Sequence, residues 1–483
     1  MAQLLDHRDG PRDECGVFGI FAPGHEVARF AYFALFALQH RGQESAGIAT
    51  ATHRGNIMTI RDQGLVSQVF DEHKLRSLVG DMAIGHVRYS TTGSSAWENS
   101  QPIVRDDSRM LALAHNGNLI NAVELHSELR EAGVPFHSTS DSEIIAALLS
   151  IHPAPRIQDA VADVLPRLRG AFSTVVLTED AVVAFRDPHG LRPLSIGRID
   201  APDGPPTWCV ASESCAFDMI GATLVREVEP GEVVTLSASG LDAQMVAGGQ
   251  RRAFCVFEYI YFARPDSRMG GTVLQAARGR MGEILWREAP VDADVVIPVP
   301  DSGNAAARGL ARASGLPTDD GFIKNRYVAR TFIQPGQELR RQGVRMKFNP
   351  VPEVVAGQRL VVVDDSIVRG TTDRQIVQML RDAGAAEVHL RISAPPIKHP
   401  CHYGIDMSTR EEMIAHGRTV EEICAELGAD SLHYLSLEGV YEAVRGHRGD
   451  HCDACFTGEY PLRGTETANG KFALAHELPL VRA

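Results

Sequence analysis

A cysteine near the start of the chain is the first residue that could act as a nucleophile. Cys15 opens the run Gly16–Ile20, whose small and apolar residues predict a strand. A thiol beside a base loses its proton readily, and the thiolate can attack a carboxamide carbon. A lone cysteine in such a run is also compatible with a buried core thiol. Residues farther along the chain have to decide between these two interpretations.

Three later segments carry the side chains that hydrolysis of an amino-acid amide requires. Arg88 ends a predicted strand and can hold a carboxylate through two hydrogen bonds. Asn116 and Gly117 combine an amide side chain with a flexible backbone N–H, which are the donor types of an oxyanion hole. Asp141 offers a carboxylate for a substrate amino group. Together with Cys15 these residues indicate cleavage of an amide whose substrate carries both charges of a free amino acid.

These segments resemble the class II glutamine amidotransferase domain, a member of the N-terminal nucleophile (Ntn) hydrolases. The matching sequences occur in the family's order: CGVFGI, QHRGQESAG, GHVRYST, HNGN and TSDSE. The resemblance implies that residues 1–14 are a propeptide, removed autocatalytically, and that Cys15 then becomes the first residue. A free α-amine has a pKa of about 7.7–8.0, so it can accept the thiol proton near neutral pH. By the same resemblance Asn116 and Gly117 stabilise the oxyanion, and glutamine is bound by Arg88, Tyr89 and Asp141.

Two adjacent acids mark a second candidate site. Asp364 and Asp365 follow the apolar run Val361–Val363, and a loop of Ser, Arg, Gly and Thr residues comes next. Paired acids in this place could simply cap the following helix. The loop, however, brings backbone N–H groups and hydroxyls to a helix N-terminus, where they form an anion cradle. Acids beside such a cradle suit a ribose that carries a 5-phosphate and an associated Mg²⁺.

This run is similar to the phosphoribosylpyrophosphate (PRPP) loop of the type I phosphoribosyltransferases. The resemblance assigns PRPP binding to Asp364, Asp365, Ser366, Val368, Arg369, Gly370, Thr371 and Thr372. The sequence Pro298–Gly303 resembles the loop that those enzymes use for pyrophosphate, which adds Asp301 and Ser302. Mg²⁺ is expected at Ser302, Asp364 and Asp365.

A basic segment lies between these two loops. The chain from Lys324 to Lys347 is rich in Arg, Gly and Gln, which is compatible with a solvated surface or with a cover that closes over a tetra-anionic substrate. Its sequence resembles the flexible catalytic loop of the glutamine PRPP amidotransferases. Ala329 stands where glycine is expected, a change that bears only on the rate of loop closure. The resemblance adds Lys324, Arg326, Tyr327 and Lys347 to the PRPP-binding residues.

Both resemblances converge on the amidophosphoribosyltransferase family and cover the chain from Cys15 to about Tyr460. The family implies that ammonia from glutamine is channelled to C1 of PRPP, giving 5-phosphoribosylamine, pyrophosphate and glutamate. This is the first committed step of de novo purine (IMP) biosynthesis. An allosteric homotetramer that purine nucleotides inhibit is implied as well. One alternative, another class II amidotransferase, would lack VVVDDSIVRGTT; the other, a non-catalytic PRPP-binding regulator, would lack Cys15 and its partners.

Four of the eight cysteines point to a metal group. Cys452 and Cys455 form a CxxC pair, whereas Cys255 and Cys401 lie far from it in the sequence. From the residues alone, core thiols and a zinc site with His399, His402 and His451 stay open as alternatives. One branch of the resembled family holds a structural [4Fe–4S] cluster at the positions filled here by Cys255, Cys401, Cys452 and Cys455, and thiolates suit such a cluster. The remaining thiols, Cys209, Cys215 and Cys424, are expected in the core.

The first half of the chain has to position the amide-hydrolysing residues on strands. The run Val27–Leu38 is apolar around its whole circumference, so we expect a helix that is covered on nearly all sides in a layered α/β sandwich. A second helix is predicted over Ser140–Ser150. The resemblance implies the αββα sandwich of the Ntn hydrolases. Strands are predicted at Cys15–Phe21, Ala83–Tyr89, Met110–His115, Phe172–Leu177 and Ala181–Arg186.

The second half indicates a doubly wound parallel sheet, and the resemblance of its loops implies the type I phosphoribosyltransferase fold. Asp294–Val299 and Arg359–Val363 are short apolar runs that suit strands buried on both faces, and Asp373–Ala383 has the pattern of a helix stopped by Gly384. Ligands of such folds bind at the carboxyl ends of the strands. A Gly- and Ala-rich stretch at 237–253 marks the boundary. The predicted domains are the propeptide 1–14, an amidotransferase domain 15–245, a phosphoribosyltransferase domain 246–445 and a tail 446–483 with cluster ligands.

Composition limits the remaining possibilities. The 483 residues are 44% hydrophobic and 23% charged, which is typical of a globular protein of two or three domains. The chain has 48 Lys and Arg against 61 Asp and Glu, and its net charge of −13 argues against general affinity for nucleic acid or an anionic membrane. No long apolar run and no secretory signal is evident, so a cytoplasmic location is expected.

Overall fold

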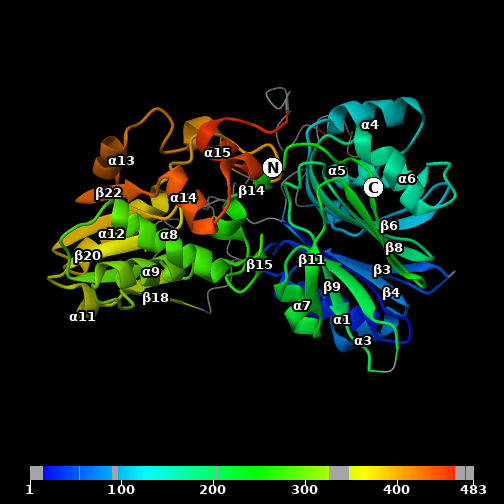
Figure 1. The fold of residues 1–483 in the computed structure, drawn as a ribbon, viewed down its shortest axis with the longest axis horizontal. Helices are drawn as coiled ribbons and strands as arrows, with labels where there is room; N and C mark the ends of the chain where they lie inside the picture. The colour runs from blue at the N-terminus through cyan, green and yellow to red at the C-terminus, as the bar shows by residue number, and fades with distance from the viewer. Residues whose placement is uncertain are drawn as a thin grey trace.

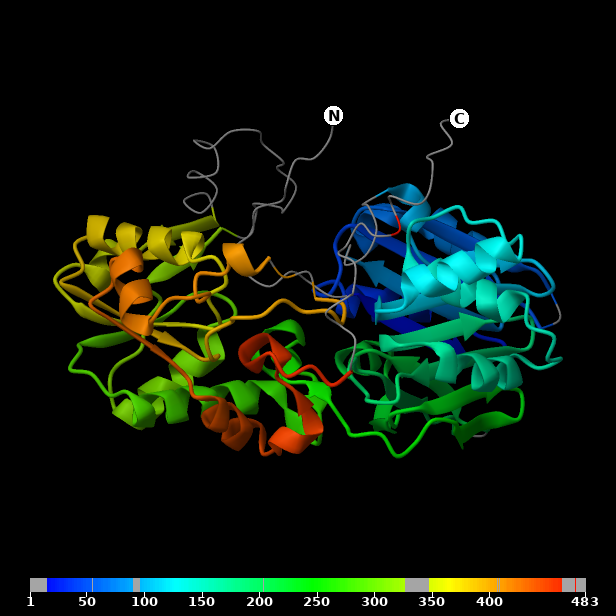
Figure 2. The same ribbon diagram turned by 90° about the horizontal axis from the view of Figure 1, so that it is seen from above.

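The chain forms two lobes that lie side by side in both views (Figures 1 and 2). The computed structural model describes residues 15–53, 55–89, 96–202, 204–325, 347–405, 407, 409–462 and 474. The expected propeptide 1–14, the PRPP-binding residues Arg326 and Tyr327, Ala329 and most of the expected tail lie outside the described residues. Within them, no helix is both long and apolar enough to cross a membrane.

Two antiparallel sheets are stacked face to face in the first lobe. The first sheet has the strand order β11-β9-β10-β1-β4-β2-β3, and the second has the order β13-β12-β8-β7-β6-β5. The strands of the first are β1 Gly16–Phe21, β2 Ser45–Ala51, β3 Ile57–Gln63, β4 Met82–Arg88, β9 Ser195–Ile199, β10 Thr207–Ala211 and β11 Thr223–Glu227. Those of the second are β5 Ile103–Asp106, β6 Met110–Leu119, β7 Gly170–Leu177, β8 Ala181–Arg186, β12 Glu232–Ser237 and β13 Gly240–Met245.

Helices cover the outer face of each sheet, so the lobe is the expected αββα sandwich. Alternate residues of β1 divide between the layers: Val17 faces the second sheet, whereas Phe18 packs under the helices. On the first sheet lie α1 Val27–Ala37, α2 Val66–Val69, α3 Glu72–Ser77 and α7 Cys215–Ile220. On the second lie α4 Ala122–Glu131, α5 Asp141–Ser150, α6 Ile157–Val164 and the short turn η2 Leu165–Arg167; the turn η1 Trp97–Asn99 precedes β5.

One expectation for this lobe is wrong. α1 is not covered on nearly all sides, because Phe33 and Phe36 are 44% and 49% exposed. Only the face with Ala31, Ala34 and Leu35 is pressed against the sheet, while Tyr32 packs against the two exposed phenylalanine rings. An apolar circumference shows that a helix could be buried on any side, but the number of layers around it decides how many sides are covered.

The second lobe is built on a parallel sheet of order β17-β20-β21-β22, as the apolar runs predict. Val361 and Val363 of β20 face one helical layer, and Leu360 and Val362 face the other. The strands are β17 Val295–Pro298, β20 Arg359–Asp364, β21 Glu387–Ile392 and β22 Ser431–Tyr434. The helices are α8 Leu274–Glu288, α9 Asn304–Ser314 and α14 Leu437–Val444 on one face and α11 Pro352–Val355, α12 Thr371–Asp382 and α13 Val420–Leu427 on the other.

Short elements complete this lobe and extend it toward the first. The segment after residue 446 contains a short strand, β23, which pairs in parallel with β14, and a short helix, α15. The remaining elements are β14 Phe254–Cys255, β15 Arg268–Met269, β16 Thr272–Val273, β18 Phe322–Lys324, β19 Phe348–Pro350, β23 His451–Cys452, α15 Ala454–Thr457, the π-helical turn η3 Glu258–Phe262, and η4 Arg410–Glu412 and η5 Arg448–Asp450.

Candidate active sites and cysteine pocket

A pocket of about 220 Å³ in the first lobe brings together most of the predicted glutamine-site residues. Five different segments of the chain contribute to it, which is why the motifs lie so far apart in the sequence. Its lining residues are Cys15, Arg88, Tyr89, Gln101, His115, Gly117, Ser140, Asp141 and Ser142.

Cys15 immediately precedes β1, an inner strand that is paired with β10 on one side and β4 on the other. Its Sγ lies 3.4 Å from the carbonyl oxygen of Tyr89, and its own carbonyl oxygen accepts a hydrogen bond from Arg41 Nε at 2.9 Å. The residue is 5% exposed. A rigid sheet therefore fixes the backbone that carries the candidate nucleophile.

The candidate oxyanion donors lie on β6, which continues to Leu119 rather than ending at His115, because it pairs with β7 as far as Gly170. Asn116 is 2% exposed, and among the described residues its Nδ2 has no hydrogen-bond partner. Gly117 has φ +149°, and a Cβ there would lie 1.9 Å from the carbonyl oxygen of Ala171, so only glycine fits. Asn116 is not among the residues that line the pocket, but its neighbour Gly117 is. The buried amide of Asn116 can therefore donate a hydrogen bond to a ligand in the pocket.

Two opposite charges face the pocket. Asp141 is the first residue of α5, and Ser140 provides the N-cap by accepting a hydrogen bond from Ser142 N. The Oδ2 atom of Asp141 accepts a hydrogen bond from Leu119 N at 2.9 Å. Arg88 is 3% exposed; burial lowers the pKa of its guanidinium, and the nearby charges of Glu44, Cys15 and Asp141 oppose that shift. An arginine and an aspartate in one small pocket match the carboxylate and the ammonium of a free amino acid.

Sequence reasoning assigned no role to four residues of this pocket: Gln101, His115, Ser140 and Ser142. Gln101 Oε1 accepts a hydrogen bond from His115 N at 2.7 Å, and its Nε2 donates to Ser142 Oγ at 3.0 Å. Burial lowers the pKa of His115, which the charge of Asp141 only partly offsets. His115 could have been found from its place in the His-Asn-Gly-Asn motif, whereas Gln101 carries no local signal because its partners come from β6 and α5.

The two acids of the second candidate site lie at the carboxyl end of β20, as the doubly wound pattern predicts. Asp364 ends the strand, and its Oδ1 accepts a hydrogen bond from Asp365 N at 2.8 Å. Burial raises the pKa of Asp364 well above its usual value, and the charges of Asp365 and Asp373 raise it further. A cluster of buried acids with this property favours a bound cation or a hydrogen-bond donor at the site.

The loop after these acids leads directly into α12. Gly370 has φ +75° and precedes Thr371, the first residue of the helix, so Thr371 and Thr372 stand at its positive end. Ser366 Oγ donates a hydrogen bond to Asp365 Oδ1 at 2.6 Å. Val368 is buried in the core, while Arg369 lies 3.3 Å from Glu412.

The predicted pyrophosphate loop lies beside this site. Gly303 packs so tightly against β20 that a Cβ there would lie 2.3 Å from the carbonyl oxygen of Val363. Asp301 and Ser302 precede it at the end of β17, and Lys324 forms an ion pair with Asp301. Lys347 is exposed, with its ammonium 4.8 Å from the ring centre of Phe348. The structure thus groups Asp301, Ser302 and Lys324 near the end of β17.

A second pocket, of about 330 Å³, contains all four predicted cluster cysteines. The strands β14 and β23 place Cys255 opposite Cys452, and Cys401 Sγ accepts a hydrogen bond from Tyr403 N at 3.3 Å. Burial raises the pKa of the Cys452 thiol to about 12 and that of Cys455 well above its usual value. Within the described ranges no three His, Cys, Asp or Glu residues are grouped around one metal-ion position.

Two of the other three thiols are core residues as expected, whereas Cys424 is only partly buried. Cys209 and Cys215 are buried in the first lobe, and burial raises the pKa of both. Cys424 lies on α13, and its Sγ donates to the carbonyl oxygen of Ala429 at 3.3 Å. None of the three lines the four-cysteine pocket.

Comparison with known proteins gives a consistent result. Residues 86–218 match the model of a family described as glutamine amidotransferase domain. The amidophosphoribosyltransferase of Bacillus subtilis is 49% identical over 466 residues, which cover 95% of this chain and 96% of the relative. That of Archaeoglobus fulgidus is 52% identical over 455 residues, covering 93% of this chain and 98% of the relative.

Solved structures agree with the sequence relatives. One described as the allosteric regulatory enzyme of purine biosynthesis has a TM-score of 0.87 at 47% identity and covers 93% of this chain and 97% of its own. The glutamine PRPP amidotransferase of B. subtilis complexed with ADP and GMP has a TM-score of 0.86 at 48% identity. The matched part covers 92% of this chain and 97% of the B. subtilis chain. The similarity therefore extends over both lobes.

Proposed function

Because this chain belongs to the amidophosphoribosyltransferase family, we propose that the pocket at Cys15 releases ammonia from glutamine and that the site at Asp364 and Asp365 transfers it to PRPP. The overall activity is that of the amidophosphoribosyltransferases, which are 49% and 52% identical to this chain over nearly its whole length. The assignment of glutamine hydrolysis to the first lobe is supported by one pocket that contains Cys15, Arg88, Gly117 and Asp141. The test is to incubate the purified protein with glutamine and Mg²⁺-PRPP and to measure glutamate and pyrophosphate; release of one without the other would contradict it.

The chemistry at the first pocket begins with Cys15 as the first residue of the mature chain. Its α-amine takes the thiol proton, and the thiolate attacks the carboxamide carbon of a glutamine held by Arg88 and Asp141. Asn116 Nδ2 and the Gly117 N–H stabilise the oxyanion of the tetrahedral intermediate. The amine returns its proton to the departing ammonia, and water then cleaves the thioester to glutamate. Intact-mass measurement tests the removal of residues 1–14.

At the second site, ammonia displaces pyrophosphate from C1 of the ribose. Asp364 and Asp365 face the ribose hydroxyls, the Ser366–Thr372 loop holds the 5-phosphate, and Asp301, Ser302 and Lys324 hold the pyrophosphate. Mg²⁺, when bound, neutralises charge on the pyrophosphate, and a buried acid pair with a raised pKa at Asp364 fits such an ion. Arg326, Tyr327 and Lys347 belong to this proposal on the family resemblance alone.

Replacing Asn116 separates catalysis from binding in the first pocket. We expect Asn116→Ala to lower the glutamine-dependent kcat by about 10²–10³-fold, because one oxyanion donor is worth about 2.7–4 kcal/mol of barrier. The KM for glutamine should change little, since Arg88 and Asp141 are retained. Steady-state kinetics with glutamine and with ammonium chloride check this prediction.

The matched control is Asn121→Ala. Asn121 is also a buried amide, but its hydrogen bonds go to backbone atoms of Arg167 and Arg169. It should lower stability and leave the glutamine-dependent kcat nearly unchanged. An equal loss of kcat in both variants would remove Asn116 from the oxyanion hole.

We further propose that the second pocket holds a [4Fe–4S] cluster. Four cysteines from three separate segments line it, and the buried thiols have raised pKa values that a positively charged metal group would lower. The cluster would be structural, tying the segment around β23 and α15 to β14 and to the Cys401 loop.

Cys452→Ser provides the test of this pocket. We expect the variant to lose the brown visible absorbance and most of about four iron atoms per chain, and to unfold at a lower temperature, because metal binding is coupled to folding. Absorption spectroscopy, iron analysis and thermal melting measure the three effects. Cys424→Ser is the control and should retain iron; a wild-type chain purified without oxygen that holds zinc instead would refute the cluster.

Regulation and assembly complete the proposal. The B. subtilis structure complexed with ADP and GMP supports inhibition of this chain by purine nucleotides. A homotetramer and a cytoplasmic location are proposed from the family resemblance. Inhibition assays with AMP, GMP and ADP test regulation by nucleotides. Sedimentation of the purified protein tests the homotetramer.

A further inference from the structure

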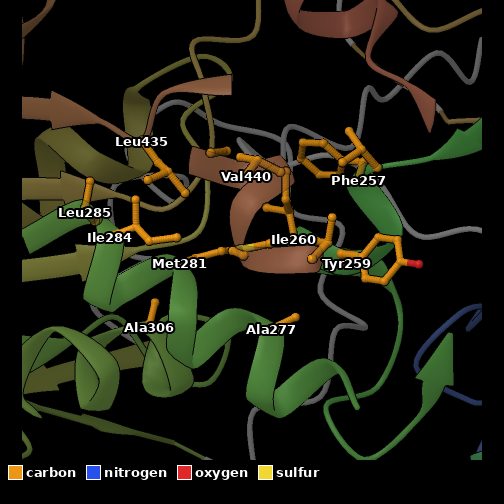
Figure 3. Close-up of a cluster of buried hydrophobic side chains, with 14 of the residues drawn as sticks. Phe257, Tyr259, Ile260, Ala277, Met281, Ile284, Leu285, Ala306, Leu435 and Val440 are labelled. Atoms are coloured by element: carbon orange, nitrogen blue, oxygen red, sulfur yellow. The ribbon is translucent and has the colours of Figure 1, made fainter. Parts of the chain in front are cut away.

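A carboxylate of the second lobe binds an arginine of the first lobe that contacts Cys15. Glu258 begins the π-helical turn η3, and its neighbours Phe257, Tyr259 and Ile260 are buried in the main core of the second lobe. Figure 3 shows Ile260 next to Met281 of α8, with Phe257 and Tyr259 farther out in the same cluster. The backbone of Glu258 is therefore set by the second lobe.

The side chain of Glu258 holds Arg41 of the first lobe with both oxygens. Arg41 donates to Glu258 Oε1 at 2.7 Å and to Oε2 at 3.0 Å, and both side chains are 0% exposed. The Nε of the same guanidinium donates to the carbonyl oxygen of Cys15 at 2.9 Å. A single rigid, planar group thus joins the core of the second lobe to the backbone of the candidate nucleophile.

The other charges around Arg41 leave it little freedom to turn. Glu213 accepts a hydrogen bond from Arg41 at 2.6 Å and one from His40 at 2.7 Å, and it also accepts from Arg264 N and Ser267 Oγ of the second lobe. Although burial alone would raise it, the pKa of Glu213 is lowered by His40 and Arg41. Arg192 lies 3.7 Å from Glu258. In this buried network every nitrogen of the Arg41 guanidinium donates at least one hydrogen bond, so loss of one acceptor frees the guanidinium to shift.

We propose that Glu258 is a positioning residue for glutamine hydrolysis: through Arg41 it fixes the carbonyl group of Cys15 and with it the thiol and the α-amine. This inference rests on the proposed role of Cys15 as the nucleophile. An N-terminal nucleophile carries its base on its own backbone, so a turn of that residue misplaces both reacting groups at once. The second lobe would thereby set the efficiency of a reaction that takes place in the first.

The proposal predicts a split between two activities of the intact protein. We expect Glu258→Gln to lower the glutamine-dependent kcat by about tenfold to a hundredfold, the size of effect that a displacement of about 1 Å produces. Ammonia-dependent synthesis should stay within about twofold, because the carboxylate of Glu258 makes no described hydrogen bond to a candidate PRPP-binding residue. The KM for glutamine should stay unchanged, because Arg88 and Asp141 are intact. Alkylation of Cys15 by iodoacetamide, followed on its peptide by mass spectrometry, should slow.

Two further variants keep the test decisive. Glu258→Asp retains the charge but shortens the reach, so it should show a smaller split of the same kind, and it substitutes for Glu258→Gln if that variant does not fold. Glu288→Gln is the matched control: this carboxylate of the same lobe binds Ser436 and no residue of the first lobe in the hydrogen bonds described. It should lower stability without a split.

Equal loss of both activities in the Glu258 variants, or unchanged glutamine hydrolysis and alkylation, would overturn the proposal. Cys15→Ser belongs in the same series. If Cys15→Ser retained glutamine hydrolysis, the assignment of the nucleophile would fail, whatever the Glu258 variants did. The two failures are thus distinguishable.

Discussion

Cys15→Ala should abolish glutamine-dependent synthesis and spare ammonia-dependent synthesis. We expect the first activity to fall by at least about 10⁴-fold, because removal of a nucleophile leaves only the contribution of binding and the oxyanion hole. The second should stay within about twofold, because independent sites usually contribute additively. Pyrophosphate release, measured once with glutamine and once with ammonium chloride near pH 8.5, gives both values.

Cys209→Ala is the control for this experiment. Its thiol is fully buried in the same lobe, and burial raises its pKa, so it has no thiolate to contribute. We expect a stability loss and normal activity with either nitrogen donor. Retention of glutamine-dependent synthesis in Cys15→Ala would show that another group performs the attack.

Asp364→Asn should act in the opposite sense and disable transfer while leaving glutamine cleavage. Loss of one charge that we propose holds the ribose and its metal should lower ammonia-dependent synthesis by at least about 10²-fold, as for other electrostatic contacts to a reacting group. Glutamate release without PRPP should persist. Asp382→Asn, on the exposed side of α12, should leave both activities unchanged. Equal activity of Asp364→Asn and wild type would exclude a role for this acid.

The same substitution should stabilise the metal-free protein at neutral pH. The pKa of Asp364 is raised in the folded state, so the native protein binds more protons than the unfolded chain, and stability falls as pH rises through the interval above the usual aspartate value. Asparagine carries no charge, so it avoids the destabilisation that ionised Asp364 causes. Its amide oxygen can still accept the hydrogen bond from Asp365 N. We expect a gain of at least about 1 kcal/mol at pH 7, since each tenfold change in proton affinity is about 1.4 kcal/mol. Thermal melting with a chelator present measures it, and the gain should vanish near pH 4.

Much of the fold could be predicted because it depends on local patterns. β8 and the helix α5 match their predicted ranges within one residue, and the short apolar runs became β17 and β20. Boundaries failed where pairing with a distant strand decided them, as for the extension of β6 along β7. The strands β21 and β22 were missed, since their partly polar sequences reveal burial only after the helices are placed.

The candidate sites show the same division. Residues with a special chemistry and a fixed spacing, such as Cys15, Gly117 and Asp364, could be identified from the sequence and lie in pockets or at strand ends. Gln101 and Glu258 could not, because an ordinary side chain becomes functional only through neighbours supplied by other segments. The contact of Gly404 with Gly117, where an added Cβ would lie 2.9 Å from the Gly117 carbonyl carbon, is equally invisible in the sequence.

The pairing of β1 with strands on both sides has a consequence for the proposed removal of residues 1–14. The registers Gly16–Val87 and Phe18–Ala211 leave the strand no freedom to slide lengthwise. A leader cut one position early would therefore put the new terminal nitrogen about 3.3 Å farther along the strand, out of reach of the sulfur. A cut one position late would discard the sulfur altogether. The proposed cleavage would have to be accurate to a single peptide bond, since the paired strand cannot shift to compensate for a misplaced cut.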